Sequence, residues 1–391
     1  MKKKILHCNE FFAKIGENYI FDQVNNNNTF ESILVSEKHI NSTYEPVDDN
    51  KRLFLRKLFN SNLVEKIFNR ITLNIFERLY LLILSQYFLA KLKPLKSEIS
   101  IIHAHFGHIA YKYIGLAKLL NVPMVVTFYG VDASACAVDP YWIKRLKVMF
   151  QYASVIIVLC ESAKKSLISV GCKESKIIIW DIGIPIENYK YEPTLKLKEN
   201  TVVRFLIVAR FVEKKGYDVL LDAFKKLSQN ESNISLTIVG YGPLKSKIKS
   251  KIEFLNLQEY INVIDTSEVS NFFEMFKYNL ETHDLFVLPS IIASNGDDEG
   301  GPPIVITNAM AAGLPVISTP VGGIERAIID NKTGFLVKPN DSDSLHEKMS
   351  YLCKHKSQWR VVSDAARLLV ESNFNKEKQL EKINKIYSNL V

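Results

Sequence analysis

Short runs of apolar residues recur along the chain, separated by longer segments in which apolar and polar residues mix. Most runs are continuous rather than alternating, which is typical of parallel strands that are covered on both faces. They form two series, one in each half of the chain. The expected strands cover residues 4–8, 99–106, 124–128, 155–160 and 177–180 in the first half, and 203–209, 235–239, 261–264, 284–288, 315–318 and 334–337 in the second.

The segments between these runs have the spacing of amphipathic helices. In residues 217–227, for example, one stripe that a sheet can bury is formed by Val219, Leu220, Ala223, Phe224 and Leu227. Alternation of strands and helices predicts doubly wound α/β domains with parallel sheets. Because 391 residues are too many for one ordinary core, two such domains are expected.

A polar stretch at residues 189–200 has the composition of a linker between the two domains. We therefore expect a first Rossmann-like domain over residues 1–195 and a second over 200–370. The last segment, residues 371–391, carries a helical pattern and is expected to fold back onto one of the two domains.

Composition narrows the class of protein. Hydrophobic residues make up 47% of the chain, which excludes wholesale disorder. The five cysteines lack the paired spacing of zinc sites, and they are expected to be reduced. The N-terminal lysines are not followed by the apolar core of a secretory signal, so a cytoplasmic protein is expected. The net charge of +8 suits an anionic ligand or membrane surface, whereas the dispersed lysines argue against nucleic acid.

Residues 51–93 combine many basic residues with many apolar ones, against only Glu65 and Glu77. The longest uncharged run in this stretch, residues 79–90, is too short to span a bilayer. One interpretation is a basic amphipathic surface that lies on an anionic membrane, at the inner face of the plasma membrane. The other is an ordinary helical pair packed on the first domain, and both can hold at once.

An acidic loop with two glycines precedes a short apolar helix in the second half of the chain. Residues 297–303 read Asp-Asp-Glu-Gly-Gly-Pro-Pro, and 304–313 read Ile-Val-Ile-Thr-Asn-Ala-Met-Ala-Ala-Gly. Proline fits the first helical turn, glycine lets backbone amides approach a ligand, and free N–H groups at a helix start suit a diphosphate. Since the run at 284–288 precedes the loop, the unit is expected to be strand, ligand loop and helix.

Residues 209–216 leave the end of the first strand of the second domain with the sequence Ala-Arg-Phe-Val-Glu-Lys-Lys-Gly. Strand ends in this architecture point at the ligand crevice. Arg210 and Lys215, closed by the turn at Gly216, can converge on one diphosphate, the first with a fork of donors and the second with a point charge. Lys214 is expected to be solvated.

The order of these motifs resembles the retaining glycosyltransferase family 4, of the bacterial surface-polysaccharide type. The family is also known as the group 1 glycosyltransferases. It implies the GT-B fold, two facing Rossmann-like domains with a nucleotide-sugar in the cleft between them. The motifs that carry the resemblance are His103-Ala104-His105-Phe106-Gly107, Val126-Thr127-Phe128-Tyr129-Gly130-Val131-Asp132, Arg210…Lys215-Gly216, Val239-Gly240-Tyr241-Gly242-Pro243, Glu299-Gly300-Gly301-Pro302, Ala309-Met310-Ala311-Ala312-Gly313-Leu314-Pro315-Val316, Gly322-Gly323-Ile324-Glu325 and Asn331-Lys332-Thr333-Gly334-Phe335-Leu336-Val337.

By this resemblance, Arg210 and Lys215 neutralise the donor diphosphate as it leaves, and Glu299 holds hydroxyls of the transferred sugar. Same-face attack, in which the leaving phosphate accepts the acceptor's proton, removes the need for a dedicated nucleophile. The remaining residues that the resemblance assigns to donor binding are Gly16, Gly240, Gly300, Gly301, Pro302 and Asn308, and those assigned to acceptor or sugar contacts are His105, Tyr129 and Asp132.

The chain departs from the family pattern at two of these positions. Asn308, nine positions after Glu299 rather than the usual eight, stands where the family has a glutamate that grips the ribose. Asparagine can still donate to and accept from a ribose hydroxyl, but without a charge. Tyr129 stands where many members have histidine, and tyrosine is a poor base at neutral pH.

No metal or cofactor is expected. Asp341-Ser342-Asp343 resembles the DxD motif of metal-dependent sugar transferases, but it is expected to cap a helix that begins near Ser344. The acidic run at residues 297–299 lacks further ligands nearby in sequence.

The expected function is a metal-independent, retaining transfer of sugar from a nucleotide-diphosphate sugar to a saccharide acceptor, lipid-linked by this interpretation. Its setting would be capsule, exopolysaccharide or lipopolysaccharide biosynthesis. A glycan phosphorylase or a sugar-nucleotide epimerase is a weaker alternative within the same fold. The alternative from another class is a non-catalytic partner subunit that has lost donor binding, for which Asn308 and Tyr129 would be the traces.

Overall fold

The computed structural model describes residues 3–12, 17–39, 51–54, 75–191 and 201–391, and it forms two compact units. Unit 1 consists of Met1–Trp180 together with Glu377–Val391, and unit 2 is Asp181–Lys376. The two α/β units agree with the expectation from sequence. Their division lies at Trp180, earlier than the expected linker, most of which falls outside the described residues.

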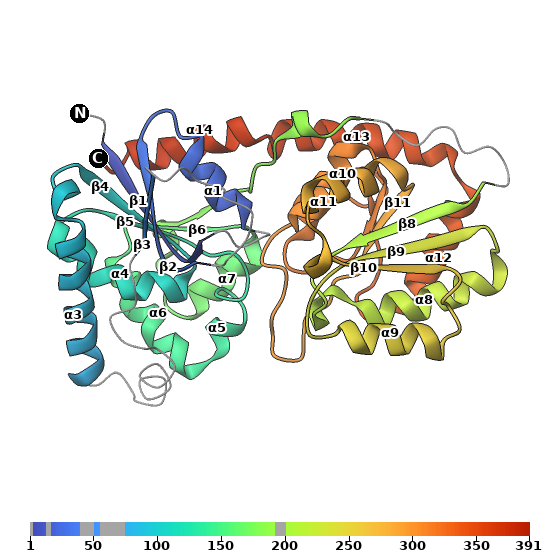
Figure 1. Ribbon diagram of the computed structural model, residues 1–391, viewed down its shortest axis with the longest axis horizontal. Coiled ribbons are helices and arrows are strands. Elements are labelled where there is room, and N and C mark those ends of the chain that lie inside the picture. Colours follow the sequence, from blue (N-terminus) through green and yellow to red (C-terminus); the bar gives the residue numbers. More distant parts are fainter. Residues whose placement is uncertain (1–2, 13–16, 40–50, 55–74, 192–200) are drawn as a thin grey trace. The chain divides into compact units, whose positions relative to one another are not determined.

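Unit 1 is built on a seven-stranded parallel sheet with the order β3-β2-β1-β4-β5-β6-β7, and helices cover both of its faces (Figure 1). Its strands are β1 (Lys4–Phe12), β2 (Glu31–His39), β3 (Arg52–Phe54), β4 (Ile99–His105), β5 (Met124–Thr127), β6 (Val155–Val158) and β7 (Ile177–Ile179). Its helices are α1 (Asn18–Asn25), α3 (Ile75–Lys91), α4 (Gly107–Leu120), α5 (Ala135–Val138), α6 (Pro140–Tyr152), α7 (Glu161–Ser169) and α14 (Lys376–Ser388).

All five strands expected in the first half are present, whereas β2 and β3 were not predicted. The signal for β2 is the run Ile33-Leu34-Val35, whose three side chains are buried, but it lies between polar residues in an asparagine-rich stretch. A short apolar run of this kind does not by itself distinguish a strand from a loop.

The helical pattern at the end of the chain forms α14, which begins at Lys376 shortly after α13 (Ser357–Asn373) ends. The segment from Glu377 onward belongs to unit 1. There the Trp180 ring N–H donates to the Gln379 carbonyl over 3.1 Å, and Tyr387 is fully buried. These contacts attach α14 to unit 1.

Unit 2 is built on a six-stranded parallel sheet with the order β10-β9-β8-β11-β12-β13. Its strands are β8 (Val203–Val208), β9 (Ile234–Gly240), β10 (Ile261–Asp265), β11 (Leu285–Leu288), β12 (Val316–Ser318) and β13 (Phe335–Leu336), all of which were predicted. Its helices are α8 (Tyr217–Asn230), α9 (Lys245–Phe254), α10 (Phe272–Thr282), α11 (Ile304–Ala312), α12 (Ser342–Lys354) and α13, arranged on both faces of the sheet (Figure 1). As predicted, α8 buries Leu220, Ala223, Phe224 and Leu227, while Val219 of the same stripe is half-buried against the core.

Each sheet reverses its strand order once. In unit 2 the chain runs outward from β8 to β9 and β10 and then returns to β11 on the other side of β8. In unit 1 the same reversal separates β1 from β4. Ligands of open α/β sheets bind at the carboxyl ends of the strands that flank such a switch point, so the loops after β8 and β11, and after β1 and β4, are the first places to search.

Part of the basic stretch 51–93 is described by the structure, as β3 and α3, while residues 55–74 lie outside the described residues. Helix α3 packs on α4, where a side chain at Gly115 would come within 2.0 Å of the Ser85 hydroxyl. Its other face leaves Leu79, Leu82 and Ile83 exposed. Among the described residues, no helix combines the length and the apolar character needed to cross a bilayer.

Candidate functional site

The loops that leave β8 and β11 lie against each other at the switch point of unit 2. After β8, Glu213–Lys215 forms a 3-10 turn that ends at Gly216 with φ +68°. A Cβ atom at Gly216 would lie 1.9 Å from the Pro289 carbonyl oxygen. Glycine is therefore required here both for the left-handed backbone and for the close approach of the two loops. Gly240, at the end of β9, is equally confined, because its Cβ would lie 1.9 Å from the Ala209 carbonyl oxygen.

This approach brings Lys215 and Glu299 together. The Lys215 ammonium lies 2.8 Å from Glu299 Oε1 and 2.6 Å from Oε2, and both side chains are buried. Burial lowers the pKa of Lys215, and the neighbouring carboxylate offsets only part of this effect. Burial alone would raise the pKa of Glu299, but Lys215, Lys214 and the Ser290 hydroxyl outweigh it and lower that pKa below its ordinary value. The ion pair thus favours the charged form of each group, against the effect of burial.

Lys214 is buried rather than solvated, so the expectation from sequence was wrong. Its ammonium lies 3.0 Å from Asp297 Oδ1 and also donates to the Asp298 carbonyl over 2.5 Å. Glu213 accepts from the Ser294 backbone N–H and hydroxyl, over 2.9 and 2.8 Å. These contacts fasten the acidic loop to the turn after β8, which the spacing of charges along the sequence could not reveal.

Arg210, by contrast, is exposed at the end of β8. Burial is the main cause of the lowered pKa of Lys215, and the positive charges of Lys214 and Arg210 lower that pKa further. Arg210, Lys214 and Lys215 thus concentrate positive charge at the carboxyl end of one strand. Since Glu299 and Asp297 occupy the two lysines, Arg210 is the cation of this group that is exposed to an incoming anion.

Helix α11 begins directly after the acidic loop, with Pro303 at its N-cap position. Gly300 and Gly301 are buried, and Gly300 has φ +68°. A Cβ at Gly322 would lie 2.6 Å from the Glu299 backbone nitrogen, so the facing loop also packs against this turn. Pro302 is half-buried at the entrance to the helix. The resulting helix start has the geometry expected for an anion site.

Asn308 lies within α11 and is buried, and its side-chain oxygen has no hydrogen-bond partner among the described residues. The neighbouring Thr307 hydroxyl instead bonds to the Ile304 carbonyl of the same helix over 2.9 Å. A buried acceptor without a donor is costly, so its presence points to a ligand or water that donates to it.

In unit 1, the three residues assigned to acceptor contacts meet at the ends of β4 and β5. The Asp132 carboxylate accepts from the backbone N–H groups of Gly107, Tyr129 and Gly130, over 2.8, 3.0 and 3.1 Å. This residue therefore fixes the loop after β5 to the start of α4. His105 is fully buried, and its Nδ1 lies 2.7 Å from the Tyr129 hydroxyl.

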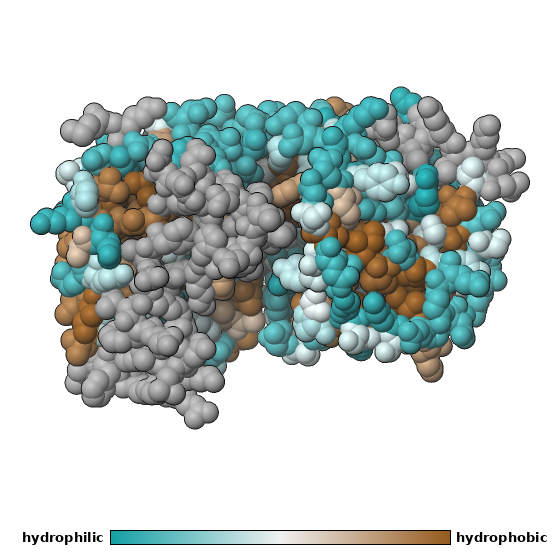
Figure 2. Space-filling view, viewed as in Figure 1, coloured by the Kyte–Doolittle hydropathy of each residue, from teal (hydrophilic) through white to brown (hydrophobic). Residues whose placement is uncertain are grey.

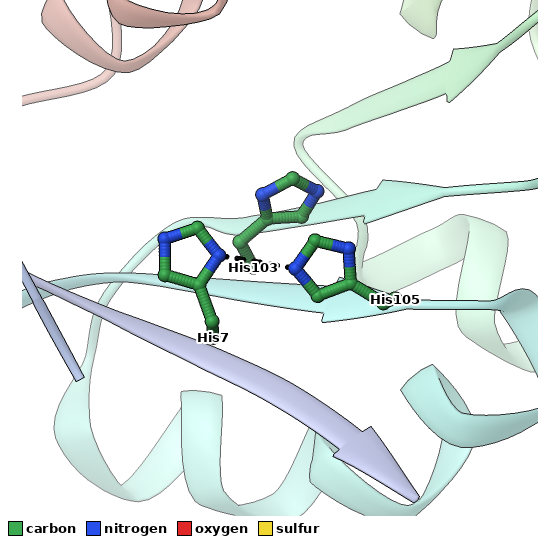
Figure 3. Close-up of side chains that lie close together, drawn as sticks. All are labelled: His7, His103 and His105. Atoms are coloured by element: carbon green, nitrogen blue, oxygen red, sulfur yellow. Dashed lines mark hydrogen bonds between the residues drawn. The ribbon is translucent and has the colours of Figure 1, made fainter. Parts of the chain in front are cut away.

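His105 also belongs to a cluster of three buried imidazoles with His7 and His103 (Figure 3). The register of β1 and β4 pairs His7 with His103, and His105 is two positions further along the same face. His7 Nδ1 lies 3.0 Å from His105 Nε2, while the two nitrogens of His103 lie 2.6 Å from the Tyr387 hydroxyl and 2.7 Å from the Thr127 hydroxyl. His7 Nε2 has no partner among the described residues.

One nitrogen of each imidazole lies within 4.8 Å of the others, so the cluster could supply three ligands to a metal ion. Burial lowers the pKa of all three histidines, that of His7 to about 3, which leaves the imidazoles neutral. Five of their six nitrogens bond to hydroxyls or to each other in a way that neutral imidazoles satisfy. Because the nitrogens of His103 and His105 are already bonded to hydroxyls and to His7, the arrangement is that of a hydrogen-bonded cluster.

Within unit 2, the structure brings together the residues expected after β8 and β11. Within unit 1, it brings together those expected after β4 and β5. Gly16 lies outside the described residues. The predicted cap is confirmed, because Asp341 accepts from the Ser344 backbone N–H over 2.9 Å at the start of α12. His7, Ser290 and Tyr387 were not expected, since each acquires its contacts only through strand pairing or chain return.

Comparison with known proteins identifies the family. The model described as "Glycosyltransferase Family 4" matches residues 53–188, and that described as "Glycosyl transferases group 1" matches residues 192–369. The amylovoran biosynthesis glycosyltransferase AmsK of Erwinia amylovora is 30% identical over 77% of this chain and 72% of its own length. The putative colanic acid biosynthesis glycosyltransferase WcaL of Escherichia coli K12 is 27% identical over 73% and 68%.

Among solved structures, Anabaena Alr3699/HepE in complex with UDP and glucose superposes with a TM-score of 0.76 at 16% identity, covering 99% of this chain and all of that one. At this level of identity the likeness shows the fold, which is GT-B as the sequence motifs implied. The match to both family models, and to a relative at 30% identity over most of its length, shows that this chain belongs to the group 1 glycosyltransferases of family 4.

Proposed function

We propose that this glycosyltransferase moves a sugar from a nucleotide-diphosphate sugar to a saccharide acceptor, with retention of configuration and without a metal ion. The observation that carries the proposal is the buried Lys215–Glu299 pair beside exposed Arg210 and the glycine-rich start of α11. Cations and a helix N-terminus suit a diphosphate, and an ionised carboxylate suits sugar hydroxyls.

In the proposed mechanism, Arg210 and Lys215 neutralise the charge that grows on the diphosphate as the glycosidic bond breaks. Charge stabilisation of this kind is usually the largest single catalytic contribution. Glu299 accepts hydrogen bonds from hydroxyls of the transferred sugar, for which it must be ionised, and its lowered pKa is suited to this role. The acceptor hydroxyl attacks from the face that the diphosphate leaves, and the leaving phosphate takes its proton.

A uridine diphosphate hexose is the first donor to test, because the crystal structure of Alr3699/HepE holds UDP and glucose. The relatives named for amylovoran and colanic acid biosynthesis favour an acceptor that belongs to a bacterial surface polysaccharide. Asn308 would bond to a hydroxyl of the donor's ribose through its unpartnered side-chain oxygen.

A lipid-linked acceptor is supported by the exposed face of α3. Leu79, Leu82 and Ile83 are 50, 54 and 44% exposed on one side of this helix, where Figure 2 shows apolar atoms at the surface. Lys91 and Lys93 are exposed at its C-terminal end. An apolar helix face next to basic residues suits the surface of an anionic membrane, where such an acceptor would reside.

The second candidate is a non-catalytic partner subunit, favoured by the replacement of the expected glutamate with Asn308. Calorimetric titration with UDP, GDP, ADP and CDP separates the two candidates, using the wild type and Lys215→Ala. A donor-binding enzyme binds one nucleotide, and the lysine variant binds it at least about tenfold more weakly. If the folded wild type binds none of the four, the partner-subunit function is supported instead.

A further inference from the structure

Ser290 lies two positions after the end of β11 and is fully buried beside the Lys215–Glu299 pair. Its hydroxyl donates to Glu299 Oε1. Its backbone carbonyl accepts from the Thr319 hydroxyl, and its backbone N–H bonds to the Leu288 carbonyl over 2.9 Å. The backbone of the serine is thus fixed by one hydrogen bond to the last residue of β11 and one to the residue that follows β12.

The Glu299 carboxylate accepts from two side chains, Lys215 and Ser290, and the proposed mechanism removes one of them. Oε1 accepts from Lys215 and Ser290, whereas Oε2 accepts from Lys215. The proposed mechanism requires Lys215 to serve the donor diphosphate, which draws its ammonium away from Glu299. Lys214 cannot replace it at short range, because its ammonium is occupied by Asp297 and the Asp298 carbonyl. The Ser290 hydroxyl is then the side-chain donor that remains on Oε1.

We propose that Ser290 is a positioning residue for sugar transfer, which keeps Glu299 ionised and directs its second oxygen toward the sugar when Lys215 engages the diphosphate. This inference rests on the proposed function. A buried carboxylate without a donor favours its protonated form, in which one oxygen becomes a donor and the other accepts without the charge that strengthens its bonds to sugar hydroxyls. A hydrogen bond to a charged group is stronger than one between neutral groups, so a single hydroxyl can stabilise the ionised form of Glu299.

The kinetic test compares Ser290→Ala with Ser318→Ala. Ser318 is a matched control, because it is fully buried at the end of β12 and its hydroxyl donates to the Leu288 carbonyl over 2.6 Å rather than to Glu299. Release of the nucleoside diphosphate from UDP-glucose, UDP-galactose and GDP-mannose is followed across pH. Ser290→Ala is expected to lower kcat by about 10- to 100-fold, with a smaller change in KM.

The pH profile distinguishes positioning from a structural role. Loss of the Ser290 hydroxyl raises the pKa of Glu299, so the acid limb of kcat moves to higher pH in Ser290→Ala and stays in place in Ser318→Ala. Ser290→Thr retains a hydroxyl and is expected to restore the position of the acid limb. The inference is overturned if Ser290→Ala has the kcat and acid limb of Ser318→Ala.

A measurement without donor separates failure of this inference from failure of the proposed function. Free energies of unfolding in urea are compared for the wild type, Ser290→Ala, Glu299→Ala and the double variant. If the serine acts through the carboxylate, the loss caused by Ser290→Ala falls to less than about half in the Glu299→Ala background. An equal loss in both backgrounds overturns the contact. Coupling in a protein that turns over none of the donors overturns the proposed function, and with it the catalytic meaning of Ser290.

Discussion

Lys215 and Glu299 are 84 positions apart in the chain, yet they form an ion pair in which one ammonium contacts both carboxylate oxygens. The family resemblance assigns the lysine to the donor diphosphate and the glutamate to the transferred sugar. In the structure each neutralises the other, so neither buried charge of the pair is isolated. In the proposed mechanism, donor binding exchanges this pair for two contacts with substrate.

Replacement of Lys215 should damage both stability and turnover, whereas replacement of Arg210 should damage turnover alone. Lys215→Ala leaves Glu299 buried without its cation, at a cost of about 3 kcal/mol. Arg210 is exposed, and Arg210→Ala is expected to leave urea unfolding unchanged. Each variant should lower transfer by about 100-fold or more. Near-normal turnover in either variant would contradict the role given to that residue. The double variant Lys215→Ala/Glu299→Gln removes both charges, so it should recover stability without recovering activity.

Gly216→Ala should disrupt the junction of the two ligand loops. The new methyl group would meet the Pro289 carbonyl oxygen at 1.9 Å, and the backbone has φ +68°. Gly171→Ala is the control, because Gly171 also has a positive φ but its nearest neighbour is the flexible Lys147 side chain at 3.9 Å. We expect Gly216→Ala to lower the thermal midpoint more than Gly171→Ala and to weaken nucleotide binding. Equal effects in differential scanning calorimetry would show that the loops can move apart.

Asn308→Ala should weaken nucleotide binding with little loss of stability. The buried side-chain oxygen of Asn308 has no partner within the described structure, so its removal breaks no bond to that oxygen there. Asn279→Ala is the control, since buried Asn279 bonds to the Met275 carbonyl over 2.8 Å and should lose more stability. In calorimetry, Asn308→Ala should bind UDP about tenfold more weakly than the wild type, whereas Asn279→Ala should bind UDP with the affinity of the wild type. The reverse pattern would make Asn308 a structural residue.

The histidine cluster should make the protein sensitive to acid. The unfolded histidines take up protons below about pH 6.5, but the folded ones do not, because burial lowers the pKa of His7 to about 3 and also lowers those of His103 and His105. Stability is therefore expected to fall as pH drops below about 6.5, by about 1.4 kcal/mol per pH unit for each histidine. Urea unfolding at about pH 7.5 and about pH 5.5 measures the slope.

His7→Gln provides the comparison for that slope, because it removes one imidazole and keeps polar atoms beside His105. Unfolding of the variant should take up about one proton fewer per molecule below about pH 6.5. An unchanged slope would mean that carboxylates elsewhere, rather than the cluster, dominate acid denaturation.

Turnover should survive removal of divalent cations. In the proposed mechanism the charge of the diphosphate is balanced by Arg210 and Lys215, so EDTA is expected to change kcat by less than about twofold. Loss of activity that zinc or manganese restores would contradict metal independence. If zinc then bound stoichiometrically to the wild type but not to His7→Gln, the cluster of three histidines would be the metal site.

Much of the scaffold followed from local sequence. Buried parallel strands are apolar throughout, so the strands of unit 2 were readable from runs such as residues 203–209. Asp341 was readable as a cap because its partner, Ser344, is three positions away. Strand β2 was missed because its short run lies among polar residues, where periodicity carries little information.

The site itself was predicted only as a set of residues. Motif order indicated Arg210, Lys215 and Glu299, since Lys215 and Glu299 each precede a glycine and Arg210 directly follows the expected strand at residues 203–209. Their contacts could not be predicted, because ion pairing and burial arise where separate strands end side by side. For the same reason, Lys214 was expected to be solvated, and Ser290 was not expected to bond to Glu299.

The sequence by itself determined the alternation of strands and helices, the two domains and the positions of the candidate ligand loops, because these depend on neighbouring residues. Only the tertiary structure decided which side chains meet. The pairing of His7 with His103 depends on the register of β1 and β4, and the contact of Tyr387 with His103 depends on the return of α14. Burial then sets the charge of each group, since the cost of a charge depends on everything that surrounds it.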